Sequence, residues 1–201
     1  MSDVKLLRAG DRGWLVEVAD NTAALLVARR LRAELTTLVD VVPGHRTVLA
    51  VGDAGADTLR TVAEQALGGE LEPPERKNVE IPVRYDGPDL AEVGRLTGLD
   101  AGEVVERHSA PAYTVAFLGF APGFAYLVGG DPVLDVTRLD EPRERVPAGS
   151  VATAGPYSGV YPRASPGGWR LLGRTELTLF DAARQPPALL TPGDRVRFVA
   201  L

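Results

Sequence analysis

The sequence contains no cysteine, and this absence alone removes several classes of chemistry. Disulfide bonds, thiolate zinc sites, iron–sulfur clusters and a cysteine nucleophile all require that side chain. Long apolar runs are also missing, because no stretch reaches the roughly 18 consecutive apolar residues of a membrane-spanning helix. The N-terminal residues carry no apolar segment after a basic start, so we expect no signal peptide. We therefore expect a cytoplasmic protein without a membrane partner.

Excess positive charge is the next missing feature. The formal net charge is -5, whereas a nucleic-acid partner would require a basic face. Several catalytic signatures are missing too, because the sequence has no paired-carboxylate motif, no metal-ligand cluster, no G-x-S-x-G and no Walker sequence. We therefore expect no nucleic-acid partner and no protein-bound metal, and we do not expect this chain to perform chemistry alone.

The N-terminal third has the pattern of a small α/β domain. A β-like stretch at 14–18 precedes a helical pattern that Asn21 would cap. Strands at 39–42 and 46–52, a helix from Asp57 to about Leu67 and a strand at 79–85 complete the order β-α-β-β-α-β. This order is ferredoxin-like. The polar segment 68–77 is the best candidate for a linker.

The remaining two thirds are rich in short β-prone runs that glycine and proline interrupt. Two helices are expected first, at 89–99 and 100–110, the second with Asp100 and Glu103 in capping-box spacing. Strands are then expected at 113–120, 145–155, 168–180 and 194–201. Many short strands with turn signals favour a β-barrel or a sandwich. We therefore expect an N-terminal domain at 1–77 and a β-rich domain at 78–201.

Two loops combine glycine with aromatic residues. GFAPGFAYL (119–127) would allow the close approach of a ligand, although aromatic residues beside glycines also pack in the core at barrel rims. YPRASPGGW (161–169) could form a plain hairpin turn or an anion-binding nest of successive backbone N–H groups. The sequence leaves both alternatives open for each loop.

A third loop, EPRERVPAGS (141–150), contributes two arginines. Arg143 and Arg145 lie beside glutamates in the sequence, so surface ion pairing is expected for one of them. His108 falls at the end of a predicted helix, where an ordinary histidine is commoner than a functional one. Taken together, the loops favour a β-rich half with a pocket of glycine, aromatic and arginine residues.

The motifs from residue 108 to residue 198 resemble the PxpB/KipI family, also called allophanate hydrolase subunit 1 or the carboxyltransferase C/D domain. The resemblance rests on His108, Tyr113 and Val115, followed by GFAPGFAYL, PRERVPAGSVATAG, GVYPRASPGGWRLLGRT, LFD and LLTPGDRVRF. Before residue 108 it is weaker but keeps the same order. It implies an α+β chain with a small ferredoxin-like α/β N-terminal domain, followed by a cyclophilin-like β-barrel C-terminal domain.

The resemblance also implies a function. The chain looks like the B component of an ATP-dependent 5-oxoprolinase, which converts 5-oxo-L-proline to L-glutamate, and this component would be inactive alone. The implied partners are a KipA/PxpC-like subunit in direct contact and a LamB/YcsF (PxpA)-like subunit, with a small lactam or amide as substrate. ATP and Mg2+ would act through the complex. The alternatives are a KipI-type inhibitor of a sensor histidine kinase and a carboxyltransferase subunit of the allophanate hydrolase or urea carboxylase type.

The motif positions imply the site residues. His108 would handle a proton or orient the lactam, and Arg145 and Arg174 would stabilise a developing oxyanion and phosphate. The implied substrate-binding residues are Phe120, Pro122, Gly123, Phe124, Tyr126, Ser150, Tyr157, Tyr161, Ser165, Pro166, Gly167, Gly168 and Trp169. Many family members have glutamine and threonine where this chain has Tyr157 and Ser158. If that glutamine reads the amide of the substrate, the departure predicts a different specificity.

Overall fold

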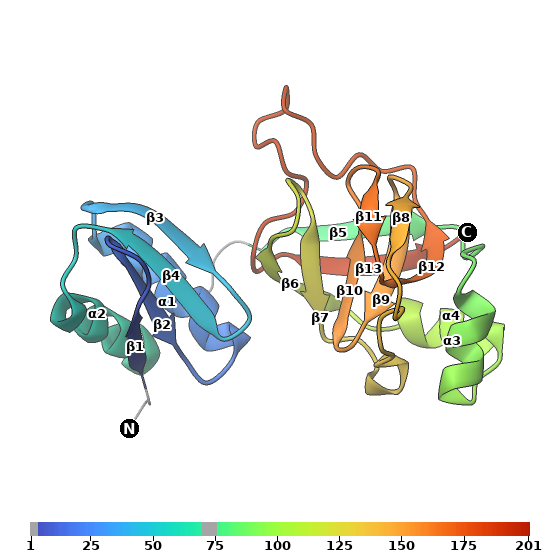
Figure 1. Cartoon of the computed structure of the whole chain (residues 1–201), viewed down its shortest axis with the longest axis horizontal. Helices are drawn as coiled ribbons and strands as arrows, with labels where there is room; N and C mark the ends of the chain where they lie inside the picture. The colour runs from blue at the N-terminus through green and yellow to red at the C-terminus, as the bar shows by residue number, and fades with distance from the viewer. Residues whose placement is uncertain (1–3, 70–75) are drawn as a thin grey trace. The chain divides into compact units, whose positions relative to one another are not determined.

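The structure is a computed structural model that describes residues 4–69 and 76–201 (Figure 1). The chain divides into two compact units, Met1–Glu75 and Arg76–Leu201. Most of the predicted linker, 68–77, lies outside the described residues. In the part of the chain that is described, no helix is long and apolar enough to cross a membrane.

The first unit is a four-stranded antiparallel sheet with two helices. Its elements are β1 (Lys5–Arg8), β2 (Gly13–Glu17), α1 (Asn21–Glu34), β3 (Leu38–Pro43), β4 (Thr47–Gly52) and α2 (Ala56–Gly68). The strands pair in the order β1-β2-β4-β3. Apolar residues at helical spacing give α1 a buried stripe that includes Val27 and Leu31, and this stripe shares one core with Val16 and Val48 of the sheet.

Two predictions for the first unit are wrong in detail. Asp20, rather than Asn21, caps α1, because its carboxylate accepts a hydrogen bond from the backbone N–H of Ala23 at 2.8 Å. The ferredoxin-like order also fails, because the strand expected at 79–85 pairs in the second unit. Its place in the first sheet is taken by β1, whose sequence KLLR lacks the alternation that marks a half-buried strand.

The second unit is built around a seven-stranded sheet. Its helical elements are α3 (Leu90–Thr97), α4 (Ala101–Ser109) and the short 3-10 helix η1 (Pro132–Leu134). Its strands are β5 (Asn78–Val83), β6 (Tyr113–Leu118), β7 (Ala125–Val128), β8 (Arg143–Val146), β9 (Ser150–Ala154), β10 (Tyr157–Val160), β11 (Ser165–Gly167), β12 (Arg170–Arg174) and β13 (Arg195–Ala200). Seven strands follow the order β12-β9-β10-β7-β6-β13-β5, and β8 and β11 form a separate two-stranded ribbon.

The large sheet is nearly closed into a barrel. β5 begins the unit and β13 ends it, yet the two pair in parallel and lie side by side (Figure 1). Just after β5, Arg84 exchanges two backbone hydrogen bonds of 2.9 Å with Arg174 of β12. Because β5 and β12 stand at the two ends of the strand order, this bridge joins the edges of the sheet.

Local patterns predicted most elements of this unit. Both helices are present, and α4 begins with the expected capping box between Asp100 and Glu103. The expected strand at 145–155 is interrupted, because a turn separates β8 from β9. The expected strand at 168–180 ends at Arg174, so the prediction of a longer strand is wrong there.

The sheet carries apolar side chains on both faces because neighbouring residues of a strand point in opposite directions. On β7, Ala125 and Leu127 belong to one core cluster, whereas Tyr126 packs against another. On β9, Val151 belongs to the first cluster and Ala152 to the second. The first cluster fills the barrel, and the second is the foundation of the candidate site.

Candidate functional site

Seven aromatic rings gather on the second unit, and we call this set the aromatic cluster. Its members are Phe117, Phe120, Phe124, Tyr126, Tyr157, Tyr161 and Trp169. Phe117 stacks on Tyr126 with ring centroids 4.3 Å apart, and most other pairs meet edge to face. Such pairs add about 0.5–1.5 kcal/mol each beyond the burial of their area.

A glycine on β10 lets the rings pack tightly. A Cβ at Gly159 would lie 3.2 Å from a ring carbon of Phe124 and 3.2 Å from one of Trp169. The rings of Phe124 and Trp169 therefore pack directly against the backbone of β10, an approach that a side chain at position 159 would hinder. A second close approach occurs in the ribbon, where a Cβ at Gly167 would lie 2.4 Å from the Tyr161 hydroxyl.

Phe120 differs from the rest of the cluster because it is 60% exposed and has strained backbone geometry. Its φ is 64°, a region that residues other than glycine rarely adopt. The N–H of Ala121 donates to the carbonyl of Gly119 at 2.7 Å, so Phe120 is the central residue of a γ-turn with positive φ. Strain of this kind persists where the surroundings enforce it, often at binding sites.

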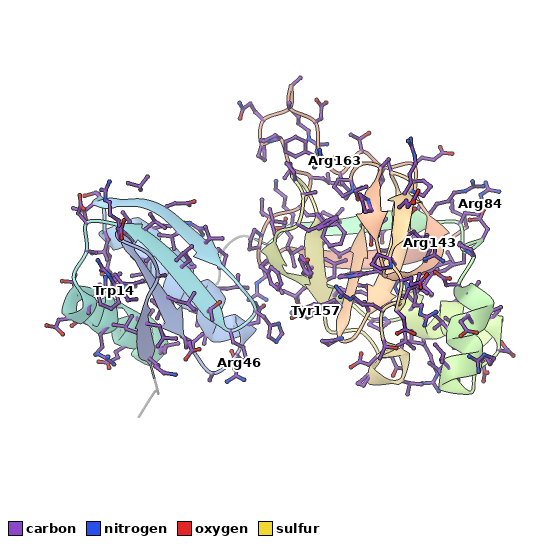
Figure 2. The ribbon with its side chains drawn as sticks, in the orientation of Figure 1. Trp14, Arg46, Arg84, Arg143, Tyr157 and Arg163 are labelled. Atoms are coloured by element: carbon purple, nitrogen blue, oxygen red, sulfur yellow. The ribbon has the colours of Figure 1, made fainter. Side chains whose placement is uncertain are left out.

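Arg143 of β8 is held by a buried carboxylate. Its Nη2 lies 2.7 Å from Oδ1 of Asp89, and the other oxygen of Asp89 accepts a hydrogen bond of 2.7 Å from the N–H of Leu171. Asp89 is only 6% exposed. Arg143 therefore pairs with Asp89 and not with a neighbouring glutamate; Figure 2 labels Arg143 together with Tyr157.

Arg138 is a cation at the cluster that the sequence analysis missed. The carbonyl of Thr137 accepts a hydrogen bond from Arg170, and the N–H of Leu139 donates to the carbonyl of Gly168. These two bonds hold the backbone on both sides of Arg138 against the residues that flank Trp169. The charge of Arg138 acts on two tyrosines of the cluster. Burial raises the pKa of the hydroxyls of Tyr126 and Tyr161, and the positive guanidinium of Arg138 opposes this rise at both. Arg138 lies between the recognised motifs, so no sequence signal identified it.

His108 is fully buried and makes two side-chain hydrogen bonds. Its Nδ1 lies 2.7 Å from the Tyr85 hydroxyl, and its Nε2 lies 3.1 Å from Oγ of Ser158. Burial lowers the pKa of His108 to about 3, so the ring is neutral at pH 7. The hydroxyl of Tyr113 also donates to the backbone carbonyl of His108 at 2.9 Å.

The structure places His108 and the aromatic cluster on opposite faces of the sheet. Ser158 binds His108, whereas Tyr157, the preceding residue of β10, stacks on Trp169. Consecutive side chains of a strand point in opposite directions. His108 packs instead against Phe198, with ring centroids 4.5 Å apart.

The three predicted catalytic residues are not brought together. Arg174 is exposed and pairs with Asp86 at 2.9 Å, next to the bridge with Arg84 that Figure 2 helps to locate. Arg145 is exposed on β8. In the parts of the chain that the structure describes, no hydrogen bond or ion pair joins any two of His108, Arg145 and Arg174.

The 161–169 loop forms part of the ribbon. Ser165 and Gly167 of β11 pair with β8, so this loop supplies one strand of the two-stranded ribbon. The anion-binding nest at its end stays a prediction. Oγ of Ser165 is buried and has no hydrogen-bond partner among the described residues.

The other predicted substrate-binding residues are spread around the cluster. Gly123 packs against Phe180, while Pro122 is exposed on its loop and Pro166 is exposed in β11. Ser150 is buried at the start of β9. Residues 4–69 and 76–201 contain no group of three or more histidine, cysteine, aspartate or glutamate side chains that could hold a metal ion.

The second unit is thus a nearly closed barrel that carries the aromatic cluster on one face of its sheet. Residues 4–190 match the model of the carboxyltransferase domain, subdomain C and D, and the chain belongs to this family. It is similar to the B component of the 5-oxoprolinase of Escherichia coli O157:H7, with 43% identity over 92% of this chain and 87% of the relative. It is also similar to the corresponding 5-oxoprolinase component of Bacillus subtilis (strain 168), with 47% identity over 63% of this chain and 54% of the relative.

Solved structures agree with this assignment. The crystal structure of TTHA0988 has a TM-score of 0.82 and 40% identity over 94% of this chain. This chain spans only 40% of the length of TTHA0988. The urea carboxylase of Kluyveromyces lactis has a TM-score of 0.72 over 98% of this chain and 22% of that protein. At 22% identity, this last likeness shows the fold alone.

Proposed function

We propose that this chain is the B component of an ATP-dependent 5-oxoprolinase, which converts 5-oxo-L-proline to L-glutamate. The observation that carries the proposal is the 43% identity, over 92% of this chain, to a relative with that name. The aromatic cluster supports it, because flat rings with a few polar groups suit a small cyclic ligand.

The complex is part of the same proposal. The chain contacts a KipA/PxpC-like subunit directly, works with a LamB/YcsF (PxpA)-like subunit, and is inactive alone in the cytoplasm. Both relatives are named as one subunit of an enzyme, which supports a complex. The greater length of TTHA0988 supports a further region that acts beside this one. We also infer that the chain has two domains, at 1–77 and 78–201, a boundary two residues from the division between the compact units, and that the barrel is cyclophilin-like.

The proposed reaction overcomes the resonance of a lactam amide. The γ-phosphoryl group of ATP passes to the carbonyl oxygen of the lactam, leaving ADP and an imidate-type phosphate. Water then adds to the former carbonyl carbon, and the ring C–N bond breaks to release the amine and leave an acyl phosphate. A second water hydrolyses this acyl phosphate to glutamate and inorganic phosphate. The aromatic cluster would hold the ring and exclude bulk water, and Mg2+ would accompany ATP in the complex.

We also propose a role for each of the three residues that the motifs mark as catalytic. Arg145 is exposed on β8, so it is available to stabilise charge once the partner protein has docked. Arg174 would have to leave its ion pair with Asp86 to do the same. His108 acts as a positioning residue, because its bond to Ser158 holds β10 and thereby the ring of Tyr157.

The test is the release of ADP that depends on 5-oxoproline. We would assay the chain alone, then with the KipA-like subunit, then with the LamB/YcsF-like subunit added, and we expect activity only in the complete mixture. Trp169→Phe should reduce turnover, whereas the matched control Trp14→Phe, in the first unit, should not. If the subunits associate but no mixture releases ADP, the proposal is wrong. A carboxyltransferase subunit or a kinase inhibitor would then take its place.

A further inference from the structure

Arg138 stands at the edge of the aromatic cluster without an acidic partner. It is exposed, and within residues 4–69 and 76–201 no carboxylate lies at ion-pair distance from it. Its backbone position is nevertheless fixed, because the residues on both sides are hydrogen-bonded to Arg170 and Gly168. An arginine whose backbone is held by its neighbours and whose guanidinium has no acidic partner is suited to bind an anion from solution.

The surroundings of Arg138 define the kind of anion. The half-buried ring of Tyr126 and the largely buried ring of Trp169 have centroids 5.5 Å apart and meet edge to face. The hydroxyl of Tyr126 lies within the electrostatic reach of Arg138 and is a hydrogen-bond donor. Apolar ring surface next to a guanidinium and a phenol fits a molecule that has a flat ring on one side and a carboxylate on the other.

We propose that Arg138 binds the carboxylate of a small cyclic acid whose ring lies against Tyr126 and Trp169. This inference rests on the proposed function for the identity of the acid, 5-oxo-L-proline. It adds the residue that distinguishes this acid from a neutral lactam of the same ring size. A guanidinium is the best match for this task, because its planar fork meets both oxygens of a carboxylate.

Arg143 does not fill this role, although it also approaches Tyr161. Its guanidinium already binds Asp89, and that carboxylate is fixed in turn by the N–H of Leu171. A substrate carboxylate would have to displace a buried ion pair, which is costly. Arg143 therefore has a structural role in the site, and Arg138 is the arginine that we expect to bind the ligand.

Ligand binding can be read directly from Trp169. The chain has two tryptophans, so a Trp14→Phe background leaves Trp169 as the only tryptophan reporter. In this background we would measure the dissociation constants of 5-oxo-L-proline, of 2-pyrrolidinone, which lacks the carboxylate, and of cyclopentanecarboxylate, which lacks the lactam. The variants are Arg138→Gln, Arg138→Lys and the control Arg197→Gln, an exposed arginine of β13.

Arg138→Gln should weaken both acids roughly 10- to 100-fold, the range for a lost hydrogen bond to a charged group. It should leave 2-pyrrolidinone unchanged. Arg138→Lys should restore part of the affinity, because it keeps the charge but loses the fork. Arg197→Gln should bind all three ligands like the background protein.

Three results would overturn the inference. One is an unchanged affinity for the acids in Arg138→Gln, and another is an equal loss for all three ligands, which would indicate a structural role. The third is no carboxylate-dependent signal either in the full chain or in the assembled complex. Failure of the proposed function looks different: cyclopentanecarboxylate would still bind through Arg138, while the complete complex would release no ADP with 5-oxoproline.

Discussion

The stability of the second unit should fall when the pH is lowered from 7.5 to 5.0, because His108 is buried as a neutral ring. Burial lowers the pKa of His108 to about 3 from an ordinary value of 6.5. The unfolded chain therefore takes up a proton more readily than the folded one. The stabilisation is complete above about pH 6.5 and is lost as the pH falls toward 3.

The magnitude follows from the width of this window. Each pH unit below 6.5 removes about 1.4 kcal/mol of unfolding free energy. Only the interval from 6.5 to 5.0 contributes, so the expected loss is about 2 kcal/mol. Asp135 acts in the opposite direction, because burial raises the pKa of its carboxyl and protonation then favours the folded state.

Urea unfolding at the two pH values measures this loss. In a Trp14→Phe background, the fluorescence of Trp169 reports on the second unit. His108→Gln should lower stability at pH 7.5 by roughly 1–3 kcal/mol, because hydroxyl groups lose their partner, but it should remove most of the pH dependence. The matched control is His45→Gln, which changes the only other histidine and should retain the full loss.

Tyr85→Phe keeps the test decisive if His108→Gln does not fold. This variant removes one hydrogen bond to His108 and leaves the ring buried, so the loss between pH 7.5 and 5.0 should persist. Equal stability of the unmodified protein at both pH values would refute the reasoning. A loss that survives in a folded His108→Gln protein would refute it as well.

Three further substitutions test the packing of the site. Gly159→Ala should cost about 1–3 kcal/mol of unfolding free energy by overpacking two aromatic rings. The control Gly68→Ala, where a Cβ meets nothing within 4 Å, should not destabilise the protein. Thermal unfolding measures both variants, and an unchanged stability of Gly159→Ala would contradict the described packing. Asp89→Asn should cost roughly 3 kcal/mol in urea unfolding by leaving Arg143 without its partner, and a loss below about 0.5 kcal/mol would show the pair to be dispensable. Phe120→Gly and the reference Phe120→Ala both remove the ring contacts with Phe124 and Tyr161, but only glycine relieves the positive φ, so Phe120→Gly should be about 1 kcal/mol more stable than Phe120→Ala. Turnover of the complex should fall in both variants, and equal stability of the two would mean that the γ-turn is not strained.

Local sequence signals predicted the helices and the β-rich character of the second unit, but not the pairing of distant segments. The capping box of α4 involves residues three positions apart, so Asp100 and Glu103 reveal it directly. Nothing of this kind connects Asp89 with Arg143, which are 54 positions apart. The pairing of β5 with β13 is equally non-local, and for that reason the strand at 79–85 was assigned to the wrong sheet.

The aromatic cluster was accessible from the motifs, whereas its relation to His108 was not. All members except Phe117 were predicted as site residues, and the structure brings their rings into contact. The alternation of a strand predicts that Tyr157 and Ser158 face opposite ways. It does not predict that α4 delivers His108 to the Ser158 side, because this depends on how the helix docks on the barrel.

The parallel pairing of β5 with β13 determines the order in which the two units can fold during translation. The strands described in the first unit lie between Lys5 and Gly52, so its sheet can form while the ribosome is still translating the second unit. The barrel must wait for Arg195–Ala200, because among the described residues β13 is the only strand that pairs with β5. Until that strand emerges, the nascent second unit keeps an open edge at β6, so the barrel closes only after β13 has left the ribosome.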